Sequence, residues 1–295
     1  MSDIGQQIKD NFKKGNSLIK LIYINLAVFL VIKLIQVIAF LFGFSGISSL
    51  FIPWLAVPAD VEVLLTRPWT LFTYMFLHEQ FFHILFNLLW LYIFGRIFLM
   101  YLNEKRLLSL YLTGGLAGAA LYIIAFNIFP AFTDMVPHAI ALGASASVMA
   151  IVIATAVYAP DFTIHLLFLG PVKLKYIAIV SIALDILSIA GSNAGGHIAH
   201  LGGALFGYLY IAQYRKGKNL TYGFDRFMDS VFSLFKPKPK IRVTYKKPKT
   251  DIEYNKEKVK KQERINKILD KISKHGYESL TKEEKELLFR AKDEE

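Results

Sequence analysis

The pattern of hydrophobic and polar residues divides the chain into a long apolar part and a polar tail. From about Leu18 to Ala212, apolar segments follow one another with short polar breaks, and after Tyr214 the sequence becomes rich in lysine. The longest of these segments match the roughly 20 residues that a helix needs to cross the hydrocarbon core of a bilayer. The pattern therefore predicts six membrane-spanning helices, at 18–42, 71–94, 107–126, 144–158, 176–190 and 197–214.

This pattern indicates an all-α, polytopic membrane protein with a small helical tail. In the tail, Val259 to Lys274 has an amphipathic pattern ended by Gly276, and Thr281 to Glu284 matches a capping box that opens a last helix. Such a pair of helices suits binding to a cytoplasmic partner. The predicted parts are a cytoplasmic N-terminal segment (1–17), a six-helix membrane domain (18–215), a basic linker that contains lysine and proline (216–258), and a helical hairpin-like cytoplasmic segment (259–295). Within the linker, lysine and proline are most frequent at 236–249.

The distribution of lysine and arginine predicts the orientation in the membrane. Basic residues collect in cytoplasmic loops, so the side that carries them is expected to be inside. The opposite side receives only Arg67, which places both termini in the cytoplasm of a multi-pass protein of the cell (inner) membrane. No removable signal peptide is expected in the polar first 15 residues. The residues on the predicted inner side are Lys9, Lys13, Lys14, Lys20, Arg96, Lys105, Arg106, Lys173, Lys175, Arg215 and those of the tail.

Charge and cysteine content exclude several classes of protein. The net charge is +11, but residues 216–295 hold 22 Lys and Arg against 14 Asp and Glu, which is +8 of the excess. A basic tail beside a membrane favours cytoplasmic retention and attraction to the anionic lipid bilayer, and no motif indicates nucleic-acid binding. The chain has no cysteine, which excludes disulfides, cysteine nucleophiles and thiolate metal sites.

Three of the predicted helices carry polar residues near the same side of the membrane. The second, fourth and sixth spans all begin outside, and they place His83 with Asn87, Ser145, and His200 in the outer layer. His83 and Asn87 are four residues apart and share a helix face. A serine, a candidate base and further hydrogen-bond donors at one depth form a constellation suited to nucleophilic catalysis.

Small residues predict how the serine and the histidine would meet. Gly203 and Gly207 form one small face on the sixth span, and Ala146 and Ala150 form another beside Ser145. Packing through these faces allows close approach of two helices. Ser147 competes with Ser145 as nucleophile, but the two point roughly 200° apart on a helix, and the spacing from Gly143 favours Ser145.

At these residues the chain resembles the rhomboid family of intramembrane serine proteases, in its bacterial six-span type with a cytoplasmic C-terminal extension. The resemblance implies a six-helix rhomboid-like bundle in which Ser145 and His200 form a catalytic dyad. It also implies that His83 and Asn87 help to build the oxyanion hole, and that single-span membrane proteins are cut near the outer face through an acyl-enzyme, without cofactor or metal. The motifs that carry it are Arg67-Pro68-Trp69, His83 to Asn87, Gly143-Ala144-Ser145-Ala146 and Ala199-His200-Leu201-Gly202-Gly203.

Some residues depart from the family pattern or leave an alternative open. Ala146 stands where the family often has glycine, and Met149 where an aromatic residue is common. Asp185 is an ionisable residue within the fifth span, so a Ser–His–Asp triad is physically open, although the resemblance implies a dyad. The alternative function is a catalytically weak or inactive rhomboid-like protein that binds and retains membrane clients. Its usual signature is loss of the serine or the histidine, and both are present.

The other histidines of the outer side are expected to have no catalytic role. The sequence from His78 through Glu79 to His83 is one residue too long for the zinc-protease motif, so no metal site is predicted there. We expect His78 to cap the mouth of the second span or to order water there. His138 and His197 are expected to face the outer solvent.

Overall fold

The computed structural model of the chain describes residues 12, 14–44, 46–167, 170–235 and 250–292. The chain divides into two compact units, Met1–Lys236 and Pro237–Glu295. Most of the predicted N-terminal segment 1–17 and the Lys/Pro-rich stretch 236–249 lie outside the described residues.

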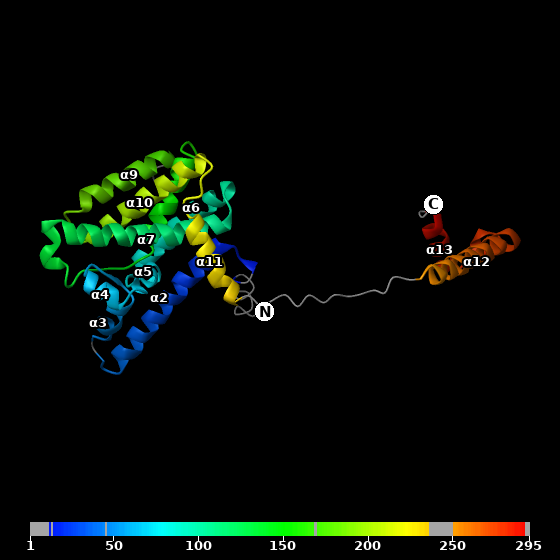
Figure 1. Cartoon of the computed structure of the whole chain (residues 1–295), viewed down its shortest axis with the longest axis horizontal. Helices are drawn as coiled ribbons and strands as arrows, with labels where there is room; N and C mark the ends of the chain where they lie inside the picture. Colours follow the sequence, from blue (N-terminus) through cyan, green and yellow to red (C-terminus); the bar gives the residue numbers. More distant parts are fainter. Residues whose placement is uncertain (1–11, 13, 45, 168–169, 236–249, 293–295) are drawn as a thin grey trace. The chain divides into compact units, whose positions relative to one another are not determined.

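Six helices build the body of the first unit (Figure 1). Three of them, α2, α6 and α7, are long and apolar enough to cross a membrane, and α8 is a shorter apolar helix. In Figure 1, α9 and α10 run side by side along one edge of the bundle. The six helices are α2 (Ser17–Leu41), α6 (Phe81–Tyr101), α7 (Glu104–Ile128), α8 (Ser145–Tyr158), α9 (Leu174–Ser188) and α10 (Ala194–Arg215).

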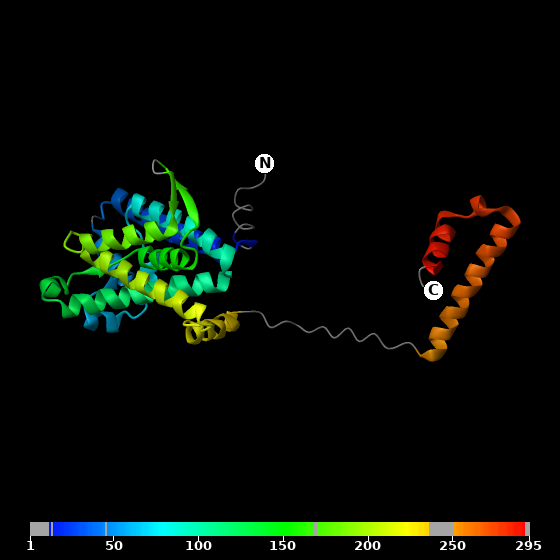
Figure 2. The same ribbon diagram turned by 90° about the horizontal axis from the view of Figure 1, so that it is seen from above.

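Short elements connect these helices. A two-residue strand, β1 (Val57–Pro58), pairs antiparallel with β2 (Ile140–Ala141), with Val57 opposite Ala141. This pairing fixes the segment that precedes α8 against the long connection between α2 and α6. At the other end of α8, the hairpin of β3 (Thr163–Leu166) and β4 (Gly170–Lys173) projects from the bundle (Figure 2). The remaining short helices are α3 (Ile47–Phe51), η1 (Ile52–Trp54), α4 (Val61–Thr66), α5 (Thr70–Thr73), η2 (Tyr74–Phe76) and η3 (Pro130–Met135).

The predicted start of the second span, at residue 71, is wrong. Helix α6 begins at Phe81, and the apolar residues before it belong to α5, η2 and a turn. Tyr74 and Met75 of this segment are buried inside the bundle, where the Tyr111 hydroxyl of α7 donates a hydrogen bond to the Met75 carbonyl at 3.0 Å. The apolar run is therefore core rather than membrane span, and His83 lies in the first turn of α6.

Helix α8 lies inside the bundle and packs against both α7 and α10 (Figure 2). On one side, a Cβ added at Gly203 or Gly207 would lie 2.1 or 2.3 Å from the carbonyl oxygens of Ala146 and Ala150. On the other side, a Cβ at Gly114 would lie 2.3 Å from the Ala150 Cβ. The backbones of the three helices are therefore almost in contact, which confirms the predicted packing through small faces.

A helix that the sequence pattern did not predict follows α10. Helix α11 (Tyr222–Phe235) falls in the stretch expected to be linker. Its Asp225 accepts a hydrogen bond from the buried Ser109 hydroxyl of α7, and its Asp229 forms an ion pair of 2.6 Å with Lys105. These two carboxylates attach α11 to the end of the bundle.

The second unit is a pair of helices joined by a short turn. It consists of α12 (Asp251–His275), η4 (Tyr277–Ser279) and α13 (Lys282–Lys292). Helix α12 begins at Asp251 rather than at Val259, because Thr250 and Glu253 form a capping box, and it ends before Gly276, whose φ is 75°. The predicted box at α13 is present, since the Thr281 hydroxyl accepts a hydrogen bond from the Glu284 N–H at 3.3 Å.

Candidate active site

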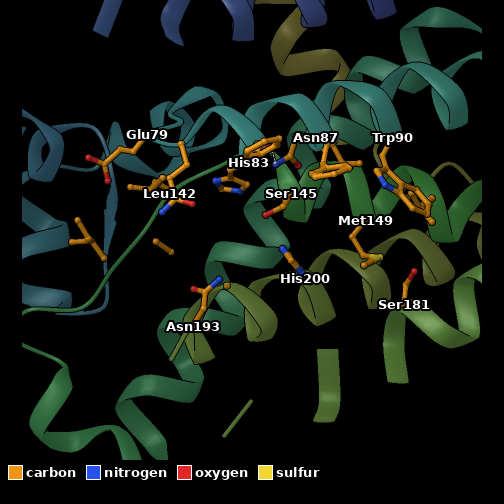
Figure 3. Close-up of a pocket in the computed structure, with 18 residues that line it drawn as sticks. Glu79, His83, Asn87, Trp90, Leu142, Ser145, Met149, Ser181, Asn193 and His200 are labelled. Carbon is orange, nitrogen blue, oxygen red and sulfur yellow. Dashed lines mark hydrogen bonds between the residues drawn. The ribbon is translucent and has the colours of Figure 1, made fainter. Parts of the chain in front are cut away.

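All four predicted site residues line one cavity of about 710 Å³ (Figure 3). His83 and Asn87 come from the first two turns of α6, Ser145 from the first residue of α8, and His200 from the second turn of α10. The cavity lies where these three helices begin. The convergence inferred from helix order and depth is therefore present in the fold.

The nucleophile candidate stands on a tightly built turn. Ser145 is half-buried, and Gly143 two residues before it has a φ of 122°, a conformation that suits glycine. The Gly143 N–H donates to the Tyr74 carbonyl at 2.9 Å, and a Cβ at Gly143 would lie 2.7 Å from the His83 ring. Ala144, the residue before the helix, offers no side-chain cap, so backbone N–H groups at the start of α8 are left for another acceptor.

His78 makes a hydrogen bond to the backbone of this turn. It lies before α6, outside the membrane-spanning helices, and it is fully buried rather than placed at the mouth of a span. Burial, together with the neighbouring His83, lowers the pKa of His78 to about 4. The neutral ring can accept a hydrogen bond through Nε2, which lies 3.3 Å from the Ala144 N–H. His78 therefore has a structural role at the start of α8.

The base candidate, His200, is held by a carboxylate. Its Nδ1 lies 2.8 Å from Oδ1 of Asp185 on α9, and its ring lies beside Ser145 in the cavity (Figure 3). Within the described residues, no direct hydrogen bond joins Ser145 and His200. Hydrogen bonds between catalytic groups are often loose without substrate and tighten when it binds.

His83 and Asn87 face the same space as Ser145. The Asn87 side-chain amide donates one hydrogen bond to the His83 carbonyl at 2.9 Å. An amide nitrogen carries two hydrogens, so a second donor remains for a ligand in the cavity. The pair can therefore supply side-chain donors near the serine, as the sequence pattern predicted.

Ser147 lies on the opposite side of α8. It is fully buried against α7, and a Cβ at Gly115 would lie 2.5 Å from its hydroxyl. Within the described part of the chain, that hydroxyl has no hydrogen-bond partner. Ser147 is a packing residue, which leaves Ser145 as the serine of α8 that lines the cavity.

The structure adds Asp185 and His197 to the site. The prediction that His197 faces solvent is wrong, because its Nδ1 lies 2.8 Å from the same Asp185 Oδ1 that bonds His200. One ligand atom from each of the three residues lies within 4.8 Å of the others, so this cluster could hold a metal ion. The sequence carried two signals of it, an ionisable residue within a span and two histidines three residues apart on one helix face.

Two protein-family models match the chain, one in each of its two units. The Rhomboid domain model matches residues 65–217, and a family of unknown function (DUF6576) matches 249–290. The RHOMBOID-like protein 12, mitochondrial, of Arabidopsis thaliana is 35% identical over 159 residues, which is 50% of this chain and 47% of that protein. The presenilin-associated rhomboid-like protein A, mitochondrial, of Danio rerio is 31% identical over 140 residues, which is 46% of this chain and 35% of that protein.

The chain thus spans less than half the length of these two relatives. The matched segment runs from the end of α4 past the end of α10 and includes every residue of the cavity named above. The family match agrees with the mostly helical bundle and its apolar helices. This chain is a membrane protein that belongs to the rhomboid family.

Proposed function

We propose that the protein is an intramembrane serine endopeptidase that uses Ser145 as nucleophile and His200 as base. One observation carries the proposal: residues of α6, α8 and α10 line a single cavity with the serine and the histidine side by side. Membership of the rhomboid family supports the reaction class, and the retained serine and histidine argue against an inactive relative.

The geometry suits attack on a peptide carbonyl. His200 takes the proton of the Ser145 hydroxyl while the oxygen attacks, and it then gives this proton to the leaving amine. The Ser145 backbone N–H, with His83 and Asn87, supplies donors for the negative oxygen of the tetrahedral intermediate. Water then hydrolyses the acyl-enzyme, and His200 serves again as base. The mechanism needs no cofactor or metal.

The substrates we propose are single-span membrane proteins cut near the outer face. The cavity extends from loop residues Glu79 and Gln80 to Trp90 on α6 and Ser181 on α9, so it faces the gap between these two helices. An extended segment of a membrane helix could enter sideways between α6 and α9. With the basic residues inside, both termini are cytoplasmic, and we place the protein in the cell membrane, whereas the two relatives are named as mitochondrial.

The test compares Ser145→Ala and His200→Ala with the wild type on a single-span substrate in proteoliposomes. Both variants should abolish cleavage, and Ser145→Ala should also abolish labelling by a fluorophosphonate probe. Ser147→Ala is the matched control and should cleave at the wild-type rate, because its hydroxyl faces α7. Full activity of Ser145→Ala contradicts the proposal. A wild-type protein that binds the substrate without cutting it would instead favour the client-binding alternative.

A further inference from the structure

His200, the proposed general base, needs a partner that fixes the orientation of its ring, and Asp185 is placed to be that partner. Asp185 lies on α9, is 5% exposed, and has its Oδ1 2.8 Å from His200 Nδ1. We propose that Asp185 is a positioning residue that holds His200 with its other nitrogen, Nε2, turned towards Ser145. The inference deepens the proposed function and rests on it.

Elementary chemistry explains what the contact does. A carboxylate accepts a hydrogen bond, so it selects the tautomer of His200 in which Nδ1 carries the proton and Nε2 is a free acceptor. Nε2 is then ready to take the Ser145 proton. When it does, the imidazole becomes positively charged, and the adjacent negative charge stabilises it. The interaction is stronger than in solution because the side chain of Asp185 is only 7% exposed.

His197 makes a second contact with the same carboxylate. Its Nδ1 donates to the same Oδ1, and its side chain is 25% exposed, against 7% for the Asp185 side chain. The carboxylate oxygen therefore receives two N–H groups from one face of α10, since the two histidines are three residues apart. This double attachment holds the carboxylate in place while His200 changes its protonation during the reaction.

The burial of Asp185 is difficult to explain as packing alone. The buried residues of α9 are Leu174, Ile177, Ala178 and Asp185, so this acid lies on an otherwise apolar face. Its second oxygen, Oδ2, is buried without a hydrogen-bond partner among the described residues. Burying a carboxylate that is only partly satisfied costs free energy, and a hydrophobic residue would join α9 to α10 without this cost.

A metal ion at the same three residues would give the cluster a different role. Asp185, His197 and His200 offer ligand atoms close enough for a cation. A bound cation would occupy the His200 Nδ1 and replace the hydrogen bond to Asp185. The positioning role needs no metal, so the activity of the purified protein should be the same with and without EDTA. Loss of activity in EDTA, restored by a divalent cation, overturns the proposal.

The main experiment measures kcat and KM for cleavage of the single-span substrate by Asp185→Asn, which keeps the shape and removes the charge. We expect kcat to fall by about 10²-fold or more while KM changes little, because the carboxylate stabilises the transition state and not the bound substrate. The equivalent change in a soluble triad protease lowers kcat by about 10⁴-fold. Labelling of Ser145 by a fluorophosphonate should slow in parallel. Asp185→Glu should recover part of the activity, because it restores a carboxylate.

The controls separate positioning from folding. Ser188→Ala also removes a polar group from α9 and should leave kcat unchanged, and thermal unfolding is measured for every variant. Wild-type kcat in Asp185→Asn, or a loss that follows the melting temperature and is not recovered by Asp185→Glu, overturns the proposal. If Ser145→Ala is inactive in the same assay, either of these two outcomes refutes only the positioning role of Asp185 and leaves the proposed function standing. If Ser145→Ala is active, the proposed function itself fails.

Discussion

Replacing Gly203 by alanine should separate the serine and the histidine without touching either of them. The added Cβ would lie 2.1 Å from the Ala146 carbonyl oxygen. This distance is roughly 1.4 Å less than the separation of about 3.5 Å at which non-bonded heavy atoms attract best. The contact is with backbone, so no side chain can turn aside, and α8 and α10 must move apart.

The movement acts directly on the site. Gly203 lies three residues after His200 on α10, and Ala146 follows Ser145 on α8. A displacement of about 1 Å between reacting groups can cost roughly 10²-fold in rate. Overpacking of this kind also costs about 1–3 kcal/mol of stability. We therefore expect Gly203→Ala to lose about 10²-fold in kcat and to melt at a lower temperature.

Cleavage of a single-span substrate in proteoliposomes and thermal unfolding in detergent measure both effects. Gly223→Ala on α11 is the matched control, because no atom lies within 4 Å of the position of its Cβ. It should keep the activity of the wild type and should not lower the melting temperature, because alanine favours a helix more than glycine does. Wild-type kcat in Gly203→Ala would refute the idea that close helix contact sets the distance between Ser145 and His200.

Two more predictions concern the oxyanion and the entry of substrate. Asn87→Ala should lower the cleavage rate by up to roughly 10²-fold, the scale for one oxyanion donor in soluble hydrolases, while Ser145 still reacts with a fluorophosphonate; unchanged turnover in the double variant with His83→Ala would reassign both residues to structure. Cysteines at Trp90 and Ser181, introduced into this cysteine-free chain and joined by a bifunctional thiol reagent, should block cleavage of membrane substrates, and the unlinked pair is the control. Normal cleavage by the linked enzyme would contradict entry between α6 and α9.

Hydropathy predicted the order of the six helices that build the bundle, although only α2, α6 and α7 are long and apolar enough to cross a membrane. It misplaced the start of α6, because hydropathy measures preference for an apolar environment and does not distinguish lipid from protein core. Met75, for example, is an apolar residue that is buried between helices of the protein rather than exposed to lipid. Helix α11 was missed because its attachment depends on Asp225 and Asp229, whose partners on α7 are far away in the sequence.

The candidate site, too, could be predicted only in part from the sequence. Ser145, His200, His83 and Asn87 could be placed together, because helix direction fixes depth and small residues mark which faces approach. The contact of Asp185 with His200 could only be left open as an alternative, and its contact with His197 was missed, because both depend on the rotation and the axial position of α9 against α10. The α9 sequence has no glycine stripe from which these could be predicted.

Gly143 offers a way to recognise inactive relatives from sequence. The space that its missing side chain leaves is filled by the His83 ring, and its φ of 122° disfavours other residues. A substitution there would therefore shift the serine loop and an oxyanion donor together. A relative that retains both the serine and the histidine, but has a larger residue at this glycine, would look like an enzyme by its catalytic pair and still be unable to stabilise the intermediate.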